Sequence, residues 1–315
     1  MELQLKNIGM IKEANVKIDG LTVIAGENDT GKSTLGKAFY ALIKEHHNVF
    51  GKNAKYYLNI YRKIFKEDFR DDYSNIILHL DLGGSISFSS INGINEKVQD
   101  IIFIETPLVW NFTDFFRDVA QFESYANIEL DYPYLMKDLN FKLHIKNASD
   151  GLDIKEKVTK LMGGEFKKDE MGRYYFDKQG QRIELVNTAT GIKYFGLFQI
   201  LSQNSYLNEN IALILDEPEV HLHPKWQLEM AKIIVELVKN GVKIVVNSHS
   251  PYMIDALKYY ADKFKVNNDF YLAEKNEDET SIIRNVTFDI SPIFEKLTEP
   301  LERLHKMKLG LVDDN

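Results

Sequence analysis

The chain has 315 residues, 44% hydrophobic and 27% charged, which is enough for one large domain or two ordinary ones. It contains no cysteine, which excludes disulfide bonds and thiolate metal sites. The net charge of −8 argues against a surface that binds nucleic acid everywhere, but it leaves room for a local basic patch. No run approaches the ~18 apolar residues of a membrane span, and the start MELQLKNIGM does not resemble a signal peptide. We therefore expect no membrane partner and a cytoplasmic location.

The first half of the chain begins with a strand pattern and then becomes less regular. Residues 1–20 alternate apolar and polar side chains around Gly9, which predicts two antiparallel strands. LTVIAG (21–26) predicts a central strand, and KSTLGKAFYALIKE a helix directly after it. Further strands are expected in NIILHLDL, SISFSS and QDIIFIETP, helices in YYLNIYRKIF, DFFRDVAQFESYA and DIKEKVTKLMGG, and a hairpin over 165–186.

The last third has the clearest periodicity. IALILD and VKIVVN predict buried strands, separated by the amphipathic helix KWQLEMAKIIVELVKNG. Ser250 and Pro251 supply the N-cap and first-turn proline of the next helix. A hairpin covers 269–286, and a last helical stretch opens at Ser291 and is interrupted at Pro300. This alternation predicts an α/β fold, taken as one domain over 1–315 with an insertion at about 45–185.

The motif GENDTGKS matches the phosphate-binding pattern G-x-x-x-x-G-K-[ST] and stands between a predicted strand and a predicted helix. Its glycines let backbone N–H groups turn toward phosphate oxygens, and the helix N-terminus adds a favourable dipole. Lys32 would reach the β- and γ-phosphates of ATP, and the Ser33 hydroxyl would ligate Mg²⁺. The predicted nucleotide-binding residues are Gly26, Glu27, Asn28, Asp29, Thr30, Gly31, Lys32, Ser33 and Thr34.

The segment LILDEPEVHLHP (213–224) ends a buried strand in a cluster of acids and histidines. Asp216 stands where a second Mg²⁺ ligand is needed, Glu217 could orient or deprotonate the attacking water, and His249 could reach the γ-phosphate. A transition-metal site at His221 and His223 would need further ligands. A third interpretation is that these histidines only cap and pack the loop before the next helix.

Together, GENDTGKS, LILDEPEVHLHP and NSHSP resemble the ABC-type ATPase heads of the SMC, DNA-repair and OLD class. The similarity is greatest to the stand-alone bacterial ATP-binding proteins of the "AAA family ATPase" type, over about 1–45 and 185–290. It implies a P-loop NTPase fold with a mixed central sheet, an antiparallel β subdomain and an inserted helical and β region. It also implies that Asp216 is the Walker B aspartate, Glu217 the catalytic glutamate and His249 the switch histidine.

The same resemblance implies a signature helix that completes the nucleotide site of a second subunit. The candidate is NTATGIKYFGLFQILSQN, with Thr190 and Gly191 as nucleotide contacts and Ala189 at the usual serine position, or Thr188 as the hydroxyl donor in a register shifted by one. Residues 219–224 would face the other subunit. IIFIETP stands where a glutamine loop belongs but offers Glu105 and Thr106 instead of glutamine.

The function implied is an ATP-dependent switch that forms a homodimer around two nucleotides and regulates a separately encoded effector, a nuclease or toxin, in phage defence or DNA processing. A non-hydrolysing scaffold and a transporter ATPase subunit are the alternatives. Nucleic acid stays open as a partner, because aromatic residues are dense over 103–134 and aromatic platforms stack bases. The acidic residues among them favour packing in a core or against a partner protein.

Overall fold

The computed structural model describes residues 1–49, 59–65, 76–81, 84–87, 91–92, 97–128, 130, 133–309 and 311. In these ranges an 11-stranded sheet has the order β6-β5-β4-β1-β2-β14-β13-β3-β12-β11-β7, and a separate 3-stranded sheet has the order β10-β9-β8. The large sheet consists of β1 (Glu2–Ile8), β2 (Ile11–Lys17), β3 (Leu21–Gly26), β4 (Ile76–His79), β5 (Ser85–Ser87), β6 (Ile91–Asn92), β7 (Asp100–Ile104), β11 (Ile211–Asp216), β12 (Lys243–Ser248), β13 (Asn268–Lys275) and β14 (Ser281–Asn285). The small sheet consists of β8 (Glu165–Lys168), β9 (Tyr174–Lys178) and β10 (Gln181–Glu184).

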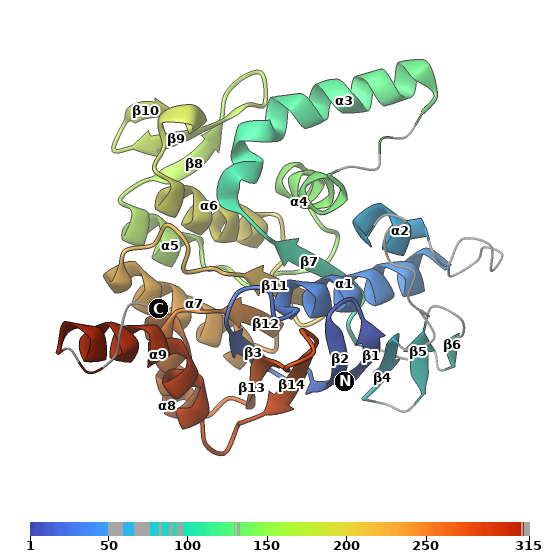
Figure 1. Ribbon diagram of the computed structural model, residues 1–315. Coiled ribbons are helices and arrows are strands. Elements are labelled where there is room, and N and C mark those ends of the chain that lie inside the picture. The colour runs from blue at the N-terminus through green and yellow to red at the C-terminus, as the bar shows by residue number, and fades with distance from the viewer. Residues whose placement is uncertain are drawn as a thin grey trace.

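Helices cover both faces of the large sheet and separate it from the small one (Figure 1). They are α1 (Lys32–Val49), α2 (Asn59–Phe65), α3 (Thr113–Ala126), α4 (Tyr134–His144), α5 (Lys155–Met162), α6 (Thr190–Gln203), α7 (Pro224–Lys239), α8 (Pro251–Phe264) and α9 (Ser291–Lys308). None of the helices in the described ranges is long and apolar enough to span a lipid bilayer.

The central strand β3 shows how the core divides. All of its residues are buried, and alternation sends Val23 to the cluster beneath α7 and α8, while Ile24 joins the cluster around α1 on the opposite face. Its parallel neighbours β12 and β13 hold it on either side. A strand buried on both faces reads as a continuous apolar run, which is why LTVIAG could be recognised from sequence.

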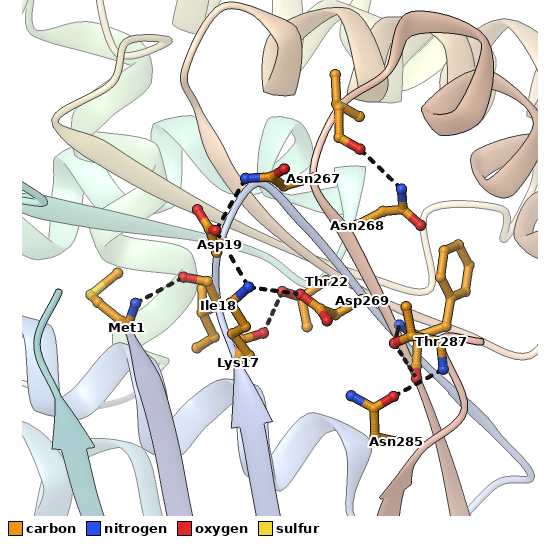
Figure 2. Close-up of polar contacts among 12 residues, drawn as sticks. Met1, Lys17, Ile18, Asp19, Thr22, Asn267, Asn268, Asp269, Asn285 and Thr287 are labelled. Atoms are coloured by element: carbon orange, nitrogen blue, oxygen red, sulfur yellow. Dashed lines mark hydrogen bonds and ion pairs between the residues drawn. The ribbon is translucent and has the colours of Figure 1, made fainter.

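The turn between β2 and β3 is fastened to the start of β13 (Figure 2). The Asn267 side-chain amide donates a hydrogen bond of 3.1 Å to Asp19 Oδ2, and the Thr22 hydroxyl donates one of 3.0 Å to the Lys17 carbonyl. These bonds fix where β3 begins. Because β3 is only six residues long, they also fix where the loop after Gly26 emerges.

The mixed α/β fold class is confirmed, with a mixed large sheet and a separate antiparallel sheet. The predicted strands and helices of the last third are also found, and the Ser250 hydroxyl caps α8 by accepting from the Met253 N–H. Parts of three predicted elements lie outside the described residues, at 56–58, at 75 and 82, and at 88–90. One domain with an insertion at about 45–185 stays a prediction, although β7 within that range pairs with β11.

Two sequence predictions are wrong in detail, and one helix was missed. The hairpin over 165–186 has a third strand, β10, and α4 was not predicted. The final helix is not interrupted at Pro300, because α9 continues through it to Lys308. Pro300 is exposed, so water can hydrate the Lys296 carbonyl that lacks a helical N–H partner.

The small sheet rests on α6 through Phe166 and Gly196. The Phe166 ring stacks on Trp110 with a centroid distance of 4.9 Å, and its backbone N–H donates to Gln199 Oε1 on α6 at 2.7 Å. A Cβ atom added at Gly196 would lie 2.3 Å from the Phe166 ring, which is buried. The absence of a side chain at Gly196 therefore sets the distance between α6 and β8.

We expect Gly196→Ala to lower the free energy of unfolding by about 1–3 kcal/mol, because the added methyl group displaces a buried ring. Chemical denaturation would measure this. The control Lys160→Ala, at an exposed position on α5, should stay within about 0.5 kcal/mol of wild type. Equal stability of Gly196→Ala and wild type would contradict the close packing of α6 against β8.

Candidate nucleotide site

The loop between β3 and α1 has the backbone geometry of a phosphate-binding loop. Gly26 and Gly31 have φ values of +153° and +85°, and a Cβ atom at Gly26 would lie 2.4 Å from the Ala273 carbonyl oxygen. Only glycine is tolerated in such a place. Asp29 between them adopts the left-handed region at φ 58°. The chain therefore closes a tight loop whose end is the N-terminus of α1, where anions bind favourably.

Lys32 lies inside this loop with only 5% of its surface exposed. Its ammonium group donates to the carbonyl oxygens of Gly26 at 3.0 Å and Glu27 at 2.5 Å. Burial lowers the pKa of Lys32, although the charges of Glu217 and Asp216 favour the ammonium form. A buried cation held by its own loop is suited to bind an anion there.

Asp216 ends β11 beside the first turn of α1. The Ser33 hydroxyl donates to Asp216 Oδ1 at 3.1 Å, and the Asn247 amide donates to the same oxygen at 2.8 Å. Burial raises the pKa of Asp216, and these two hydrogen bonds oppose the rise. A hydroxyl in contact with a buried carboxylate forms a ligand set that suits a hard cation such as Mg²⁺. The two residues predicted as metal ligands are thus brought together.

Glu217 and His249 lie next to each other beyond Asp216. Glu217 has φ 51°, a left-handed conformation that is costly for a residue with a side chain and recurs at functional sites. His249 Nδ1 lies 3.3 Å from Glu217 Oε1 and 3.6 Å from Glu219 Oε1. The predicted catalytic pair is therefore adjacent in space, although 32 positions separate it in the sequence (249 − 217).

Glu219 has a position that the sequence analysis did not foresee. It was expected in a loop facing another subunit, but it is 5% exposed. Its Oε1 accepts hydrogen bonds from the Ser248 hydroxyl at 2.7 Å and from the backbone N–H groups of His249 and Ser250 at 3.0 and 3.1 Å. Glu219 therefore fixes the backbone that carries His249.

Two cavities meet at Ser33 and Glu217, which line both. One has a volume of about 230 Å³ and includes Asn28, Thr30 and Thr34 of the phosphate loop. The other, of about 250 Å³, is bordered by Asp216 and by Glu105, Thr106 and Pro107 after β7. The segment expected in place of a glutamine loop therefore faces the site, with Glu105 and Thr106 on its wall.

Two further residues at the site were missed. Asn247 is fully buried in VKIVVN, and a polar residue in an otherwise apolar strand was the available signal. Tyr194 lines the 250 Å³ cavity, and its hydroxyl has no hydrogen-bond partner among the described residues. Burial raises its pKa well above the usual range, so the hydroxyl stays protonated and able to donate.

The two histidines of the acidic segment have different positions. His223 is the N-cap of α7, and its Nδ1 accepts from the Lys225 N–H at 3.3 Å. His221 has φ 67° and lines the cavity with Asp216 and Glu217. In the part of the chain that the structure describes, no three His, Asp or Glu side chains are grouped to hold a metal ion by themselves.

The predicted signature residues lie at a different place. Thr190 and Gly191 form the first turn of α6, which begins at Thr190. Gly191 packs against Leu222 and Trp226, and neither Thr190 nor Gly191 lines the two cavities. The buried Thr188 hydroxyl donates to the Glu184 carbonyl at 3.0 Å, so it is already committed within its own chain.

Comparison with known proteins gives both a family and a fold. The profile of the AAA ATPase domain family matches residues 90–254, which include Asp216, Glu217 and His249. An SMC head bound to the C-winged helix domain of ScpA is similar with a TM-score of 0.51, at 12% identity, over 92% of this chain and 98% of that one.

Two further SMC heads have lower scores. One, with an extended coiled coil, bound to the C-terminal domain of ScpA and derived from Pyrococcus furiosus, has a TM-score of 0.47, 12% identity and coverage of 97% and 99%. The other, from Thermotoga maritima, has a TM-score of 0.44 and 13% identity, over 90% of this chain and 98% of that one. The likeness at a TM-score of 0.51 shows that the chain has the fold of an SMC head.

Replacement of Glu219 with Gln tests the electrostatics of this site. Burial raises the pKa of Glu219, so the folded protein binds a proton there more tightly than the unfolded chain does. The stability of the wild type therefore falls as the pH rises through the interval between the two pKa values. We expect the free energy of unfolding of Glu219→Gln, relative to wild type, to increase as the pH rises above about 4, the ordinary pKa of a glutamate.

Denaturation at several pH values would measure this difference, with Glu156→Gln on the exposed face of α5 as the control. The difference in the free energy of unfolding between Glu156→Gln and wild type should not change with pH. A relative stability of Glu219→Gln that falls as the pH rises would instead mean that the three donors stabilise the ionised carboxylate more than burial destabilises it.

Proposed function

Because the chain belongs to the AAA ATPase domain family, we propose that it is an ATP-binding and ATP-hydrolysing switch that closes into a head-to-tail dimer and regulates a partner protein. The observation that carries the proposal is the 3.1 Å contact between Ser33 Oγ and Asp216 Oδ1. It joins the phosphate loop to the acidic strand end, with Glu217 and His249 beside it.

The phosphate loop would bind the triphosphate of ATP. Backbone N–H groups at the start of α1 would surround the phosphate oxygens, and the Lys32 ammonium would exchange its contacts with the Gly26 and Glu27 carbonyls for the β- and γ-phosphates. Mg²⁺, when bound by Ser33 and Asp216, neutralises phosphate charge that develops during phosphoryl transfer.

Glu217 would act on the attacking water. Its carboxylate orients the water and accepts its proton, while the water oxygen bonds to the γ-phosphorus and the bond to the ADP oxygen breaks. The His249 side chain, held beside Glu217 by the backbone contacts of Glu219, would donate a hydrogen bond to the γ-phosphate. Hydrolysis of ATP to ADP and phosphate follows.

The dimer would place the N-terminus of α6 from one subunit against the nucleotide of the other. Neither Thr190 nor Gly191 lines the cavities of its own chain, which leaves the first turn of α6 available for a contribution across a dimer. Closure on ATP and opening after hydrolysis would change the surface offered to a separately encoded effector, a nuclease or toxin of the kind used in phage defence.

One observation favours a second function, a nucleotide-dependent scaffold that binds ATP and hydrolyses it hardly at all. The signature serine position is occupied by Ala189, and the neighbouring Thr188 hydroxyl is bonded to Glu184. A contact to the γ-phosphate would then be absent from the closed dimer. The two functions differ in turnover and not in binding.

We expect Lys32→Ala to abolish ATP binding, because it removes the ammonium group within the loop. Isothermal titration calorimetry would measure this, with Lys178→Ala at an exposed position on β9 as the control of equal charge. Unchanged affinity in Lys32→Ala would refute the nucleotide site itself.

We expect Glu217→Gln to bind ATP, to lose at least about 100-fold in hydrolysis rate and to accumulate as a dimer, because the proton acceptor is removed. Light scattering after size-exclusion chromatography with ATP and Mg²⁺ would detect the dimer, and phosphate release would report turnover. Glu156→Gln should behave as wild type. A monomer in ATP for both wild type and Glu217→Gln would refute the dimer, and a wild type with no turnover would support the scaffold.

A further inference from the structure

A cavity of about 460 Å³ lies between α3, α4 and the turn that joins β8 to β9. None of its lining residues belongs to the phosphate loop. These three elements stand together on the side of the molecule that carries the small sheet (Figure 1). The volume is within the usual range of binding sites, roughly 300–1,000 Å³. We call it the α3–α4 pocket.

The lining of the α3–α4 pocket is cationic, although the chain as a whole is acidic. Four cationic side chains and one carboxylate, Asp114, line it: Arg117, Lys137, Lys168 and Arg173. Arg117 pairs with Asp114 at 2.7 Å, and Lys137 pairs with Glu123 at 2.7 Å.

The remaining two cations are not neutralised in this way. Neither Lys168 nor Arg173 has a carboxylate partner within salt-bridge distance among the described residues. Lys168 Nζ instead lies 4.8 Å from the centre of the Tyr174 ring. Burial lowers the pKa of His144 on the same wall, and the charges of Lys168 and Arg117 lower it further, as a positive potential requires.

The mouth of the pocket is apolar. Phe141 is 54% exposed and Met171 is 75% exposed, and both line the pocket. On α3, only Phe116 is buried, whereas Phe115 and Phe122 are about half exposed. Aromatic and methionine side chains beside arginine are the composition of protein interfaces.

From these observations we propose that the α3–α4 pocket binds an acidic segment of a partner protein, in which carboxylates stand next to an aromatic or aliphatic side chain. Arg173 and Lys168 receive the carboxylates, and Phe141 and Met171 cover the apolar side chain. A protein segment fits better than nucleic acid, because Arg117 and Lys137 are already paired with carboxylates, and the two remaining cations are too few to follow a continuous polyanion.

The segments that carry the pocket residues are each hydrogen-bonded to α6. Asn204 Nδ2 at the end of α6 donates to the Lys142 carbonyl of α4 at 2.9 Å, and Trp110 Nε1, just before α3, donates to the Lys193 carbonyl at 2.9 Å. From the small sheet, the Phe166 N–H donates to Gln199 Oε1 at 2.7 Å. An occupant of the pocket therefore acts on the helix that begins with Thr190 and Gly191. This deepens the proposed function and rests on it only in identifying the occupant as the regulated effector.

Selection from a displayed library of random peptides of about 12 residues on the full-length protein tests the proposal. The expected result is enrichment of peptides with carboxylates beside an aromatic or aliphatic residue. Their affinity, by fluorescence polarisation, should fall at least about tenfold in Lys168→Glu/Arg173→Glu. The affinity should stay unchanged in Lys178→Glu, which reverses the charge of an exposed residue on the same small sheet. No enrichment, enrichment of non-acidic peptides, or unchanged affinity in the double variant would overturn it.

Two further measurements exclude other occupants. If the double variant instead loses binding of a fluorescent single-stranded oligonucleotide, or loses self-association in light scattering, the pocket serves nucleic acid or a second copy of this chain, and the proposal is wrong. Peptide binding by Lys32→Ala separates the two proposals, because failure of the nucleotide site would leave the affinity of that variant for the selected peptides unchanged.

Discussion

The hydrogen bonds of Asn247 connect the parts of the nucleotide site that come from different strands. Its side-chain amide donates to Asp216 Oδ1 at 2.8 Å and to the Lys32 carbonyl at 3.2 Å, and its backbone carbonyl accepts from the Glu217 N–H at 2.9 Å. Asn247 can do this because β12 lies between β3 and β11 in parallel register. Loss of this buried amide would leave Asp216 without a donor that favours its ionised form.

Glu219 continues the same arrangement toward α8. It holds the Ser248 hydroxyl and two backbone N–H groups, while the Ser250 hydroxyl donates to Gln227 Oε1 on α7 at 2.8 Å. The start of α8, the start of α7 and the end of β12 are thereby connected through buried polar contacts. The three hydrogen bonds to Glu219 converge on its Oε1, whereas its Oε2 has no hydrogen-bond partner among the described residues. The position of His249 beside the left-handed Glu217 depends on these three bonds.

Local patterns in the sequence were sufficient for the elements that build the site. The apolar run of β3, the glycines at 26 and 31 and the N-cap at Ser250 each determine their own conformation. Features that depend on contacts between distant parts of the chain could not be predicted from local patterns. Glu219 stands in a sequence that looks exposed, and only the return of β12 buries it. The helix α4 lacks a side-chain cap, and α9 passes Pro300 because that turn faces solvent.

The arrangement of α6 links nucleotide chemistry to the far side of the molecule. Tyr194 on α6 lines the cavity of Asp216, while Gln199 and Asn204, further along, bond to β8 and α4, which border the α3–α4 pocket. The helix is buried along most of its length, and a close-packed helix moves as a unit. We therefore expect a displacement of its N-terminus to displace its C-terminus as well. Coupling between two binding sites is reciprocal. If an occupant of the pocket prefers one position of α6 and changes the affinity of the protein for ATP by some factor, ATP would change the affinity for that occupant by the same factor.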